Sequence, residues 1–386
     1  MEKAELSLDK KIESFIDSHF SNIVGIFGYG SGVIKQSGYS EKSKKQIDSV
    51  IVINDDEISV ADWHKNNMKK NPKLYGLLAR TVMNVFPEKF QNWLNRIYYF
   101  TNVKHNGDEY KVGVITKSAL LRDLKERDAY YVAARFQKPI RTIRSTEEID
   151  IAIEVNRKNV AIETVLREQK KKRFQNPEDF FIKLSRLSYI GDIRVLIPIF
   201  ENPNKVKNMV SKNINNFKEI YSPMRDLVSF NDNKIAFDRS YIRDKIAELP
   251  DDIKRKINRS VERKLNQEFI LDNIKNFRFG RTKEEYILEK FPKSTVKKNS
   301  KFSIIDNLNS LDAPTKERFD NTIRRSISRH YGVKNFNIST AQLAKGLVTA
   351  GPVKSIKYVL RKAGKGIKGI FESKTKTKSK IKTKEK

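Results

Sequence analysis

Residues 22–56 read NIVGIFGYGSGVIKQSGYSEKSKKQIDSVIVINDD, and this stretch decides the fold of the first part of the chain. An apolar run from Ile23 to Phe27 breaks into a glycine-rich turn at 28–32, and a second, β-branched run follows Asp48. Nearly continuous β-branched residues are typical of a strand buried within a sheet. The stretch therefore predicts a strand, a glycine turn, a polar excursion and a second strand.

The glycine turn, with the sequence GYGSG, has the features of a phosphate-binding loop. Glycine lets the backbone approach a ligand closely, so that several N–H groups can point at phosphate oxygens. Asp48 opens the following strand, where its carboxylate can bind Mg²⁺ that bridges those phosphates. No Lys-Ser or Lys-Thr follows the glycines, so this is not a Walker loop. On the motif alone, a tight turn between two core strands is an equally good interpretation.

The composition of the chain limits its class. A chain of 386 residues is long enough for two or three domains. Lys+Arg 78 against Asp+Glu 47 gives a formal net charge of +31, which indicates a polyanionic partner, either nucleic acid or an anionic membrane surface. The absence of cysteine excludes a disulfide framework, a thiolate nucleophile and a cysteine-ligated zinc site. The apolar runs are far shorter than the roughly 20 residues of a membrane-spanning helix.

The order of the expected elements is that of an α+β fold. A first helix carries an apolar stripe of Ile12, Phe15, Ile16 and Phe20, and Asn176-Pro177 is a typical helix start. Further strands are expected at 97–103 and 110–116 with a turn at 105–108, a hairpin at 229–238, and helices at 74–86, 118–135, 180–189, 205–221, 239–247, 251–265, 284–291 and 314–331, with a polar linker at 294–300.

The end of the chain differs from the rest. Apolar residues recur at helical spacing through 356–371, and basic residues fall elsewhere on the helical wheel. A basic amphipathic helix of this kind can lie in the headgroup plane of a membrane. The alternative is a C-terminal helix that covers the core. Residues 373–386 alternate lysine with threonine and serine, which predicts a disordered cationic tail.

Seven separated blocks occur in a fixed order along the chain: 28–33 with Gln36, 48–56, Trp63-His64 with Asn67, 111–115, 135–139, 187–194 and 345–351. Together they resemble the mitochondrial translocator assembly and maintenance family, the peripheral CDP-diacylglycerol synthases. The resemblance implies a nucleotidyltransferase-fold domain at 1–145, a mostly helical, winged-helix-like domain at 146–335, an amphipathic membrane-contacting segment at 336–372 and a disordered tail at 373–386.

The same resemblance implies an activity. CTP and phosphatidic acid would react to give CDP-diacylglycerol and pyrophosphate, with Mg²⁺, on an anionic membrane surface and without an obligatory nucleic acid. The start of the chain shows no transit peptide. We therefore expect a bacterial cytoplasmic relative, peripheral on the inner face of the cell membrane, rather than an enzyme of the mitochondrial matrix.

The candidate site residues form three groups. The turn residues expected to hold the CTP phosphates are Gly28, Tyr29, Gly30, Ser31 and Gly32. The candidate metal ligands are Asp48 and Asp55, and the candidate catalytic residues are Asp48, Lys111, Arg135 and Lys138. Strict nucleotidyltransferase strands carry a second acid two residues after the first, yet this chain has Val50 there. Asp55 lies about 23 Å further along an extended strand, at roughly 3.3 Å per residue, so it can share a metal with Asp48 only if the chain turns back.

Several of these residues also have ordinary structural interpretations. Trp63 is more typical of a core than of a base platform, and His64 of a hydrogen-bonded structural group than of a catalyst. Asp55 can equally start a turn or cap a helix. Asp192 can be a cap with Arg194 as its ion-pair partner.

Two other functions remain open from the sequence. One is a nucleotidyltransferase that acts on RNA ends or on protein, which the same turn and carboxylate would serve. Aromatic residues are not clearly interleaved with the basic runs, which argues against a stacking platform for RNA. The other is a non-catalytic membrane or nucleic-acid scaffold with a decayed nucleotide site, an alternative that Val50 keeps open. The oligomeric state does not follow from the sequence.

Overall fold

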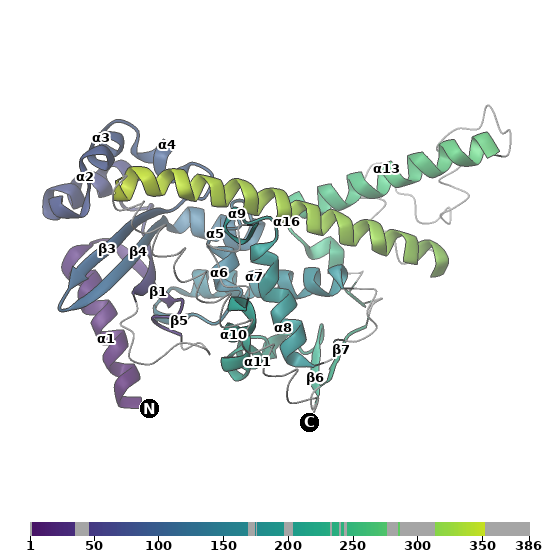
Figure 1. Ribbon diagram of the computed structural model, residues 1–386, viewed down its shortest axis with the longest axis horizontal. Coiled ribbons are helices and arrows are strands. Elements are labelled where there is room, and N and C mark those ends of the chain that lie inside the picture. Colours follow the sequence, from purple (N-terminus) through teal and green to yellow (C-terminus); the bar gives the residue numbers. More distant parts are fainter. Residues whose placement is uncertain are drawn as a thin grey trace, which may run out of the picture.

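The computed structural model describes residues 2–34, 46–168, 174, 176–196, 204–231, 234–238, 241–242, 245–275, 285 and 313–351. It is a mixed α+β fold in which a five-stranded sheet adjoins a largely helical part, and a long helix crosses both (Figure 1). The expected linker at 294–300, nearly all of the helix expected at 284–291 and the expected membrane segment beyond residue 351 lie outside the described residues.

The sheet has the strand order β3-β4-β2-β1-β5. Its strands are β1 (Ile23–Tyr29), β2 (Ile47–Ile53), β3 (Tyr98–His105), β4 (Asp108–Thr116) and β5 (Arg141–Arg144). The β2/β4 pair is parallel and the other three pairs are antiparallel. The first four strands confirm the sequence prediction. The turn between β3 and β4 is also confirmed, because Asn106 and Gly107 both have positive φ, as a tight Asn-Gly hairpin turn requires.

One face of the sheet packs against N-terminal helices. These are α1 (Glu2–His19) and α2 (Val60–Lys70), followed by η1 (Pro72–Leu74), α3 (Leu77–Val85) and α4 (Pro87–Asn92). The predicted apolar stripe of α1 is confirmed, since Ile12, Phe15 and Ile16 are fully buried in the core on this face. Each such side chain stabilises the fold by roughly 1.5–3 kcal/mol relative to exposure.

The other face is covered by α5 (Lys117–Glu126) and α6 (Ala133–Phe136). The single helix predicted at 118–135 is therefore wrong. It ends because Arg127 adopts the left-handed conformation, with φ 55°. The buried carboxylate of Asp123 then accepts hydrogen bonds from the backbone N–H groups of residues 130–133, at 2.8 Å from Val132 and 2.9 Å from Ala133. These bonds hold the segment in a loop that a continuous helix could not form.

The helical part comprises α7 (Glu147–Arg167), α8 (Pro177–Arg186), η2 (Leu187–Tyr189), α9 (Ile193–Leu196), α10 (Lys205–Lys212), α11 (Ile214–Ile220), η3 (Ser222–Met224), a small hairpin of β6 (Ser229–Asn231) and β7 (Lys234–Ala236), η4 (Lys245–Glu248) and α13 (Asp251–Lys275). The hairpin is confirmed, and so is the Asn176 cap, whose side chain accepts the N–H of Asp179 at 2.8 Å. The helix predicted at 205–221 is interrupted at Asn213.

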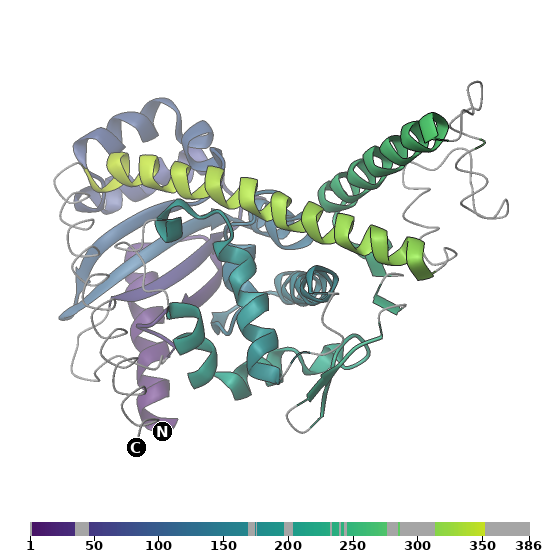
Figure 2. The same ribbon diagram turned by 45° about the vertical axis from the view of Figure 1, so that its right-hand side comes forward.

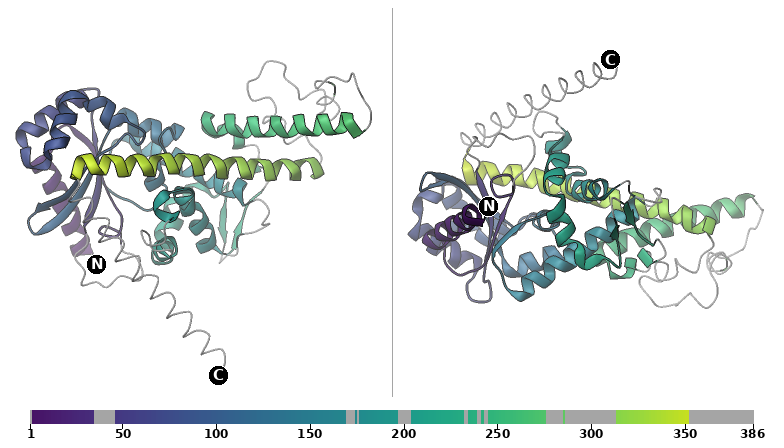
Figure 3. Two further views of the ribbon diagram at one scale, coloured as in Figure 1. Left: turned by 45° about the horizontal axis from the view of Figure 1, so that its top comes forward. Right: turned by 90° about the horizontal axis from the view of Figure 1, so that it is seen from below.

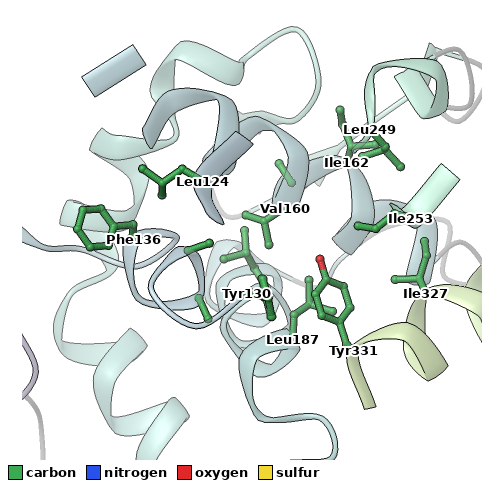
Figure 4. Close-up of a cluster of buried hydrophobic side chains, with 14 of the residues drawn as sticks. Leu124, Tyr130, Phe136, Val160, Ile162, Leu187, Leu249, Ile253, Ile327 and Tyr331 are labelled. Carbon is green, nitrogen blue, oxygen red and sulfur yellow. The ribbon is translucent and has the colours of Figure 1, made fainter. Parts of the chain in front are cut away.

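The core of the helical part contains a buried polar group among apolar side chains. Tyr130 and Tyr331 lie near Leu124, Val160 and Leu187, as Figure 4 shows. Nearby, the guanidinium of Arg127 donates to the carboxylate of Glu163 at 2.6 Å, and the hydroxyl of Tyr331 also donates to that carboxylate. All three side chains are buried, so this group ties α7 to the long helix.

The long helix α16 (Ala313–Ala350) contains 38 residues. The helix predicted at 314–331 is wrong at its C-terminal end, because α16 continues through Gly332 to Ala350. The close approach at this point depends on Gly191, since a Cβ there would lie 2.2 Å from the Gly332 carbonyl oxygen, whereas the nearest atom to a Cβ on Gly332 would be Cγ2 of Ile190 at 3.9 Å. α16 packs against α13 and α7 at one end and against β3 and α3 at the other (Figures 2 and 3). α16 continues without interruption through residue 335, where the sequence analysis places a domain boundary. The domain boundaries as a whole remain predictions.

No helix among the described residues has the length and apolar character that a membrane span requires.

Candidate active site

Three neighbouring strands bring a tyrosine, a carboxylate and a lysine into one row. In the sheet register, Tyr29 of β1 pairs with Asp48 of β2, and Asp48 pairs with Lys111 of β4. Residues paired in this way project from the same face of a sheet. The end of β1, the start of β2 and the start of β4 therefore place two residues of the predicted site, Asp48 and Lys111, directly beside each other, with Tyr29 next to Asp48.

The glycine turn follows β1 at the same edge. Gly30 has φ +75°, and a Cβ there would lie 2.8 Å from Oδ2 of Asp48. A Cβ on Gly32 would lie 2.1 Å from the carbonyl oxygen of Gln46, just before β2. Both positions require glycine, one for its conformation and both for space. Because the turn lies against the start of β2, Ser31, between these glycines, is positioned close to Asp48.

Tyrosine rings and cations surround this edge. The Tyr29 hydroxyl lies 3.4 Å from the Tyr99 hydroxyl. The guanidinium of Arg135 stacks 3.9 Å from the centre of the Tyr131 ring and 5.3 Å from that of Tyr29, and Nζ of Lys111 lies 4.6 Å from the centre of the Tyr99 ring. Such cation–π contacts hold a cation in place while its outer donors can still meet an anion.

A second group of basic residues extends the cluster towards the helical part. Nζ of Lys138 donates to Oγ of Ser188 at 2.7 Å and lies 4.7 Å from the Tyr189 ring centre, and Lys205 lies 5.7 Å from the same ring. Burial lowers the pKa of Lys138, and the charges of Lys205, Arg135 and Arg194 lower it further. The predicted residues Arg135 and Lys138 therefore belong to one cationic cluster.

The positive charges of the cluster also act on the pKa of Tyr131. Burial alone would raise it, yet the charges of Arg135, Lys111 and Arg194 hold the Tyr131 pKa below its ordinary value. A phenol is shifted in this direction when nearby cations favour its ionised form. The same field favours any anion that enters, and a nucleotide triphosphate or a phosphate monoester is such an anion.

The second predicted metal ligand, Asp55, is not near Asp48. It follows β2 at the opposite end, where the paired residues are Ile53 and Thr116. Oδ1 of Asp55 accepts the backbone N–H of Ser118 at 3.0 Å, and the Ser118 hydroxyl donates to the other oxygen. Asp55 therefore satisfies a free N–H group in the first turn of α5.

The structural interpretations of two other residues are confirmed. Trp63 is buried, and its ring N–H donates to the carbonyl of Ser21 at 2.9 Å. His64 lies between the Tyr75 hydroxyl at 2.8 Å and Oε1 of Gln91 at 2.6 Å, and burial lowers the His64 pKa to about 4.

Asp192 and Arg194 form the predicted ion pair. Nε of Arg194 lies 2.9 Å from Oδ1 of Asp192, and the backbone N–H of Arg194 donates to the same oxygen. The side chain of Asp192 thus forms an ion pair with Arg194 and also caps the start of α9.

The carboxylates near the glycine turn can be compared with the ligands that Mg²⁺ requires. Within the described ranges, no three His, Cys, Asp or Glu side chains lie together in a metal-binding group. Mg²⁺ in nucleotide sites needs only one or two protein carboxylates, because phosphate oxygens and water complete its six ligands. Asp48, beside the glycine turn, fits a metal held mainly by the phosphates.

Sequence reasoning missed five residues of the cluster, namely Tyr99, Tyr131, Tyr189, Lys205 and Arg194, the last of which was expected only as the ion-pair partner of Asp192. One signal was available, since Tyr131 and Arg135 are only four residues apart, and the guanidinium of Arg135 donates to the Tyr131 carbonyl at 2.6 Å. Tyr99 and Tyr189 come from β3 and η2, and only the tertiary fold places them at the site.

The chain was compared with known proteins. Residues 12–365 match the sequence profile of the family described as phosphatidate cytidylyltransferase, mitochondrial. Curated proteins of that name from Saccharomyces cerevisiae and Homo sapiens are each 32% identical to this chain. The yeast alignment covers 59% of this chain and 59% of the relative, and the human alignment covers 53% and 44%. The chain thus spans about half the length of these curated relatives. Because the profile matches nearly all of the chain, the chain belongs to the mitochondrial phosphatidate cytidylyltransferase family.

Proposed function

We propose that the protein is a phosphatidate cytidylyltransferase that converts CTP and phosphatidic acid into CDP-diacylglycerol and pyrophosphate. The observation that carries the proposal is the row of Tyr29, Asp48 and Lys111 beside the glycine turn, in a chain of this family. The cationic cluster supports it, because both substrates are phosphate anions.

The chemistry is a substitution at phosphorus. A phosphate oxygen of phosphatidic acid forms a bond to the α-phosphorus of CTP, and the bond from that phosphorus to the bridging oxygen breaks, with the electron pair leaving on pyrophosphate. The lipid phosphate is already anionic at neutral pH, so a strong general base is unnecessary. Catalysis then consists of alignment and charge neutralisation.

Each part of the site has a role in this reaction. The turn amides and the Ser31 hydroxyl bind the β- and γ-phosphates, and Lys111 neutralises the triphosphate from the neighbouring strand. Arg135, Lys138 and Arg194 bind the lipid phosphate and keep it next to CTP. Mg²⁺, held by Asp48, would stabilise the charge that develops on pyrophosphate. Asp55 is not part of the proposed metal site, because its carboxylate accepts the Ser118 N–H at the start of α5.

The finer fold assignment is part of the proposal. We infer that the sheet and its helices form a nucleotidyltransferase fold and that the helical part is winged-helix-like, with the hairpin of β6 and β7 as the wing. The relatives are named as mitochondrial proteins, which supports a mitochondrial location. The comparisons give no support to the bacterial location expected from the start of the chain.

One experiment tests the function against its alternatives. The purified full chain is incubated with Mg²⁺, CTP labelled in the α-phosphate and either phosphatidic acid in detergent micelles or a short RNA. We expect label in CDP-lipid, with release of unlabelled pyrophosphate, and loss of the signal with EDTA. Label in RNA or in the protein itself would contradict the proposal, and transfer to no acceptor would favour a scaffold.

A further inference from the structure

Large apolar side chains are exposed together at one end of the molecule. They lie on α3, in the turn after α4 and on α16. Leu77 is 84% exposed, Trp93 46% and Leu347 51%. Isolated exposed apolar residues are common, whereas a group of them marks a contact surface. We call this surface the apolar end, and its members are Leu77, Leu78, Val85, Phe86, Trp93, Leu94, Val333, Phe336, Leu343 and Leu347.

On α16 the exposed residues form a single stripe. Val333, Phe336, Leu343 and Leu347 follow one another at steps of three, seven and four residues, with the exposed Thr340 between them. This spacing places them on one side of the helix over about 21 Å, at 1.5 Å per residue. The buried Ile338 and other residues on the opposite side pack against the rest of the protein.

The stripe adjoins the exposed residues of α3 and of the turn after α4. α16 packs on α3, and Gly76, just before Leu77, lies beside the carbonyl of Thr349. Asn95, which follows Leu94, donates to Oε1 of Gln342 at 2.6 Å. Figures 1 and 2 both show the last turns of α16 beside this group of helices. The two sets of exposed side chains therefore lie on neighbouring elements at the same end of the molecule, while the Gln342 contact itself is made from the side of α16 opposite the stripe.

The stripe also lies next to the cationic cluster. The backbone N–H of Ile193 donates to the hydroxyl of Ser339 on α16 at 3.1 Å, so α9 lies alongside α16. Arg194, the next residue, contributes to the positive field at Tyr131. Val195 is itself 42% exposed. An apolar surface and a phosphate-binding cluster thus meet at α9.

The positive charge of the segments that form the apolar end indicates which kind of partner it binds. From residue 60 to residue 96 the chain has seven basic residues (Lys65, Lys69, Lys70, Lys73, Arg80, Lys89 and Arg96) and two acidic ones (Asp62 and Glu88), and residues 321–351 contain no Asp or Glu. A second copy would present the same positive charge, which opposes pairing. Nucleic acid would neutralise the charge but would leave leucine and phenylalanine uncovered. An anionic lipid surface satisfies both features.

We propose that the apolar end is a membrane-contacting surface that enters the headgroup region of an anionic bilayer and presents the cationic cluster to the phosphate of a lipid in that bilayer. The inference rests on the proposed lipid substrate. It adds a surface on the folded part of the chain, formed mainly by α3 and α16, to the membrane contact expected beyond residue 351. The sequence after Gly351, residues 352–386, contains thirteen basic and two acidic residues, and Gly351 itself ends the helix that carries the stripe.

The two tryptophans provide a direct test, because Trp93 is on the apolar end and Trp63 is buried in the core. The full chain is mixed with vesicles of phosphatidylcholine and phosphatidic acid whose acyl chains carry bromine, a contact quencher of tryptophan. We expect quenching in the wild type and its loss in Trp93→Phe at equal vesicle binding. Vesicle binding without quenching, or no vesicle binding, would overturn the proposal.

Charge substitutions provide a second test with a matched control. The variant Leu77→Glu/Phe336→Glu/Leu347→Glu should lower vesicle binding and activity on vesicles by at least about tenfold, because carboxylates resist transfer to the interface. Ile270→Glu/Leu271→Glu on α13 changes residues that are 54% and 59% exposed and should behave as wild type. Thermal unfolding confirms that both variants fold.

Activity in detergent micelles separates the two proposals. There the triple variant should match the wild type, since no bilayer is needed. If the wild type makes no CDP-lipid even in micelles, the proposed function fails while the vesicle-binding result still stands. If the triple variant binds vesicles as wild type does, the membrane surface is refuted, and a loss of dimer mass in that variant would assign the surface to self-association.

Discussion

The two ends of strand β2 carry the same kind of side chain in opposite surroundings. Asp48 lies beside Tyr29 and Lys111, against the glycine turn and close to a cluster of cations. Asp55, beyond the other end, accepts a backbone N–H and a hydroxyl from Ser118. A carboxylate that satisfies a helix terminus supports the fold, whereas one among phosphate-binding groups supports chemistry. The difference comes from the neighbours, since both are aspartates in one short stretch of sequence.

The largest expected effect comes from Asp48→Asn, which keeps the shape of the side chain and removes its charge. We expect CDP-lipid formation to fall at least about 100-fold, because the proposed Mg²⁺ site would lose its carboxylate ligand. The measurement is initial rate with saturating CTP and Mg²⁺. The unfolding midpoint should stay within about 2 °C of the wild type. Activity within a few-fold of the wild type would assign the metal to other residues.

A second substitution tests the cluster that distinguishes the Asp48 end. Arg135→Met keeps the packing on Tyr131 and removes the guanidinium, so we expect roughly 10- to 100-fold lower kcat/KM for phosphatidic acid. The matched control is Arg186→Met on α8, a basic residue outside the cluster. Equal losses in both variants would mean that overall charge, rather than this site, attracts the substrate.

At the other end of β2, Asp55→Ala should affect stability rather than catalysis. Loss of the acceptor for the Ser118 N–H at the start of α5 should cost about 0.5–2 kcal/mol in the free energy of unfolding, measured with urea. The kcat of the folded fraction should be close to that of the wild type. A large loss of kcat at unchanged stability would indicate instead that Asp55 takes part in catalysis.

A smaller effect concerns Lys345, which lies buried where α16 meets the sheet. Its Nζ lies 2.8 Å from the Gln91 carbonyl and close to Asn95, and burial lowers its pKa to about 7. Folding therefore disfavours its charged form, and the unfolded chain binds more protons between pH 7 and the ordinary lysine pKa of 10.5. The free energy of unfolding should rise with pH across this window, by at most about 1.4 kcal/mol per unit from this group.

The control for that pH dependence is Lys345→Met, which keeps a long apolar side chain. The difference in the free energy of unfolding between wild type and variant should vary from pH 7 to pH 9 and be constant below pH 6. A difference that is flat over the whole range would contradict a titrating Lys345.

Much of the sheet could be predicted because its signals are local. The β-branched run of β2 and the Asn-Gly turn before β4 specify their structures within a few residues. The break after α5 could not be predicted in this way. It depends on Asp123, whose carboxylate binds N–H groups seven to ten residues further along the chain. Helical periodicity does not record such a contact.

The candidate site divides in a similar way. The glycine turn, Asp48, Lys111, Arg135 and Lys138 were candidates from the sequence alone and remain predictions as site residues, and the structure brings Asp48 and Lys111 together in one register. The tyrosines that hold the cations come from separate elements, so their proximity arises only in the folded chain. The expected partnership of Asp48 and Asp55 does not occur, because β2 stays extended between them.

The contact between Gly191 and Gly332 limits how the sequence can change. A methyl group on Gly191 would meet the backbone of α16 rather than a side chain that can move, whereas Gly346, further along the same helix, has nothing within 4 Å of the added carbon. Any residue at position 191 other than glycine would push α16 away from α9, and with it the exposed apolar stripe of α16 away from the cationic cluster. In a library of single variants, position 191 should therefore tolerate almost no replacement, and position 346 should accept many.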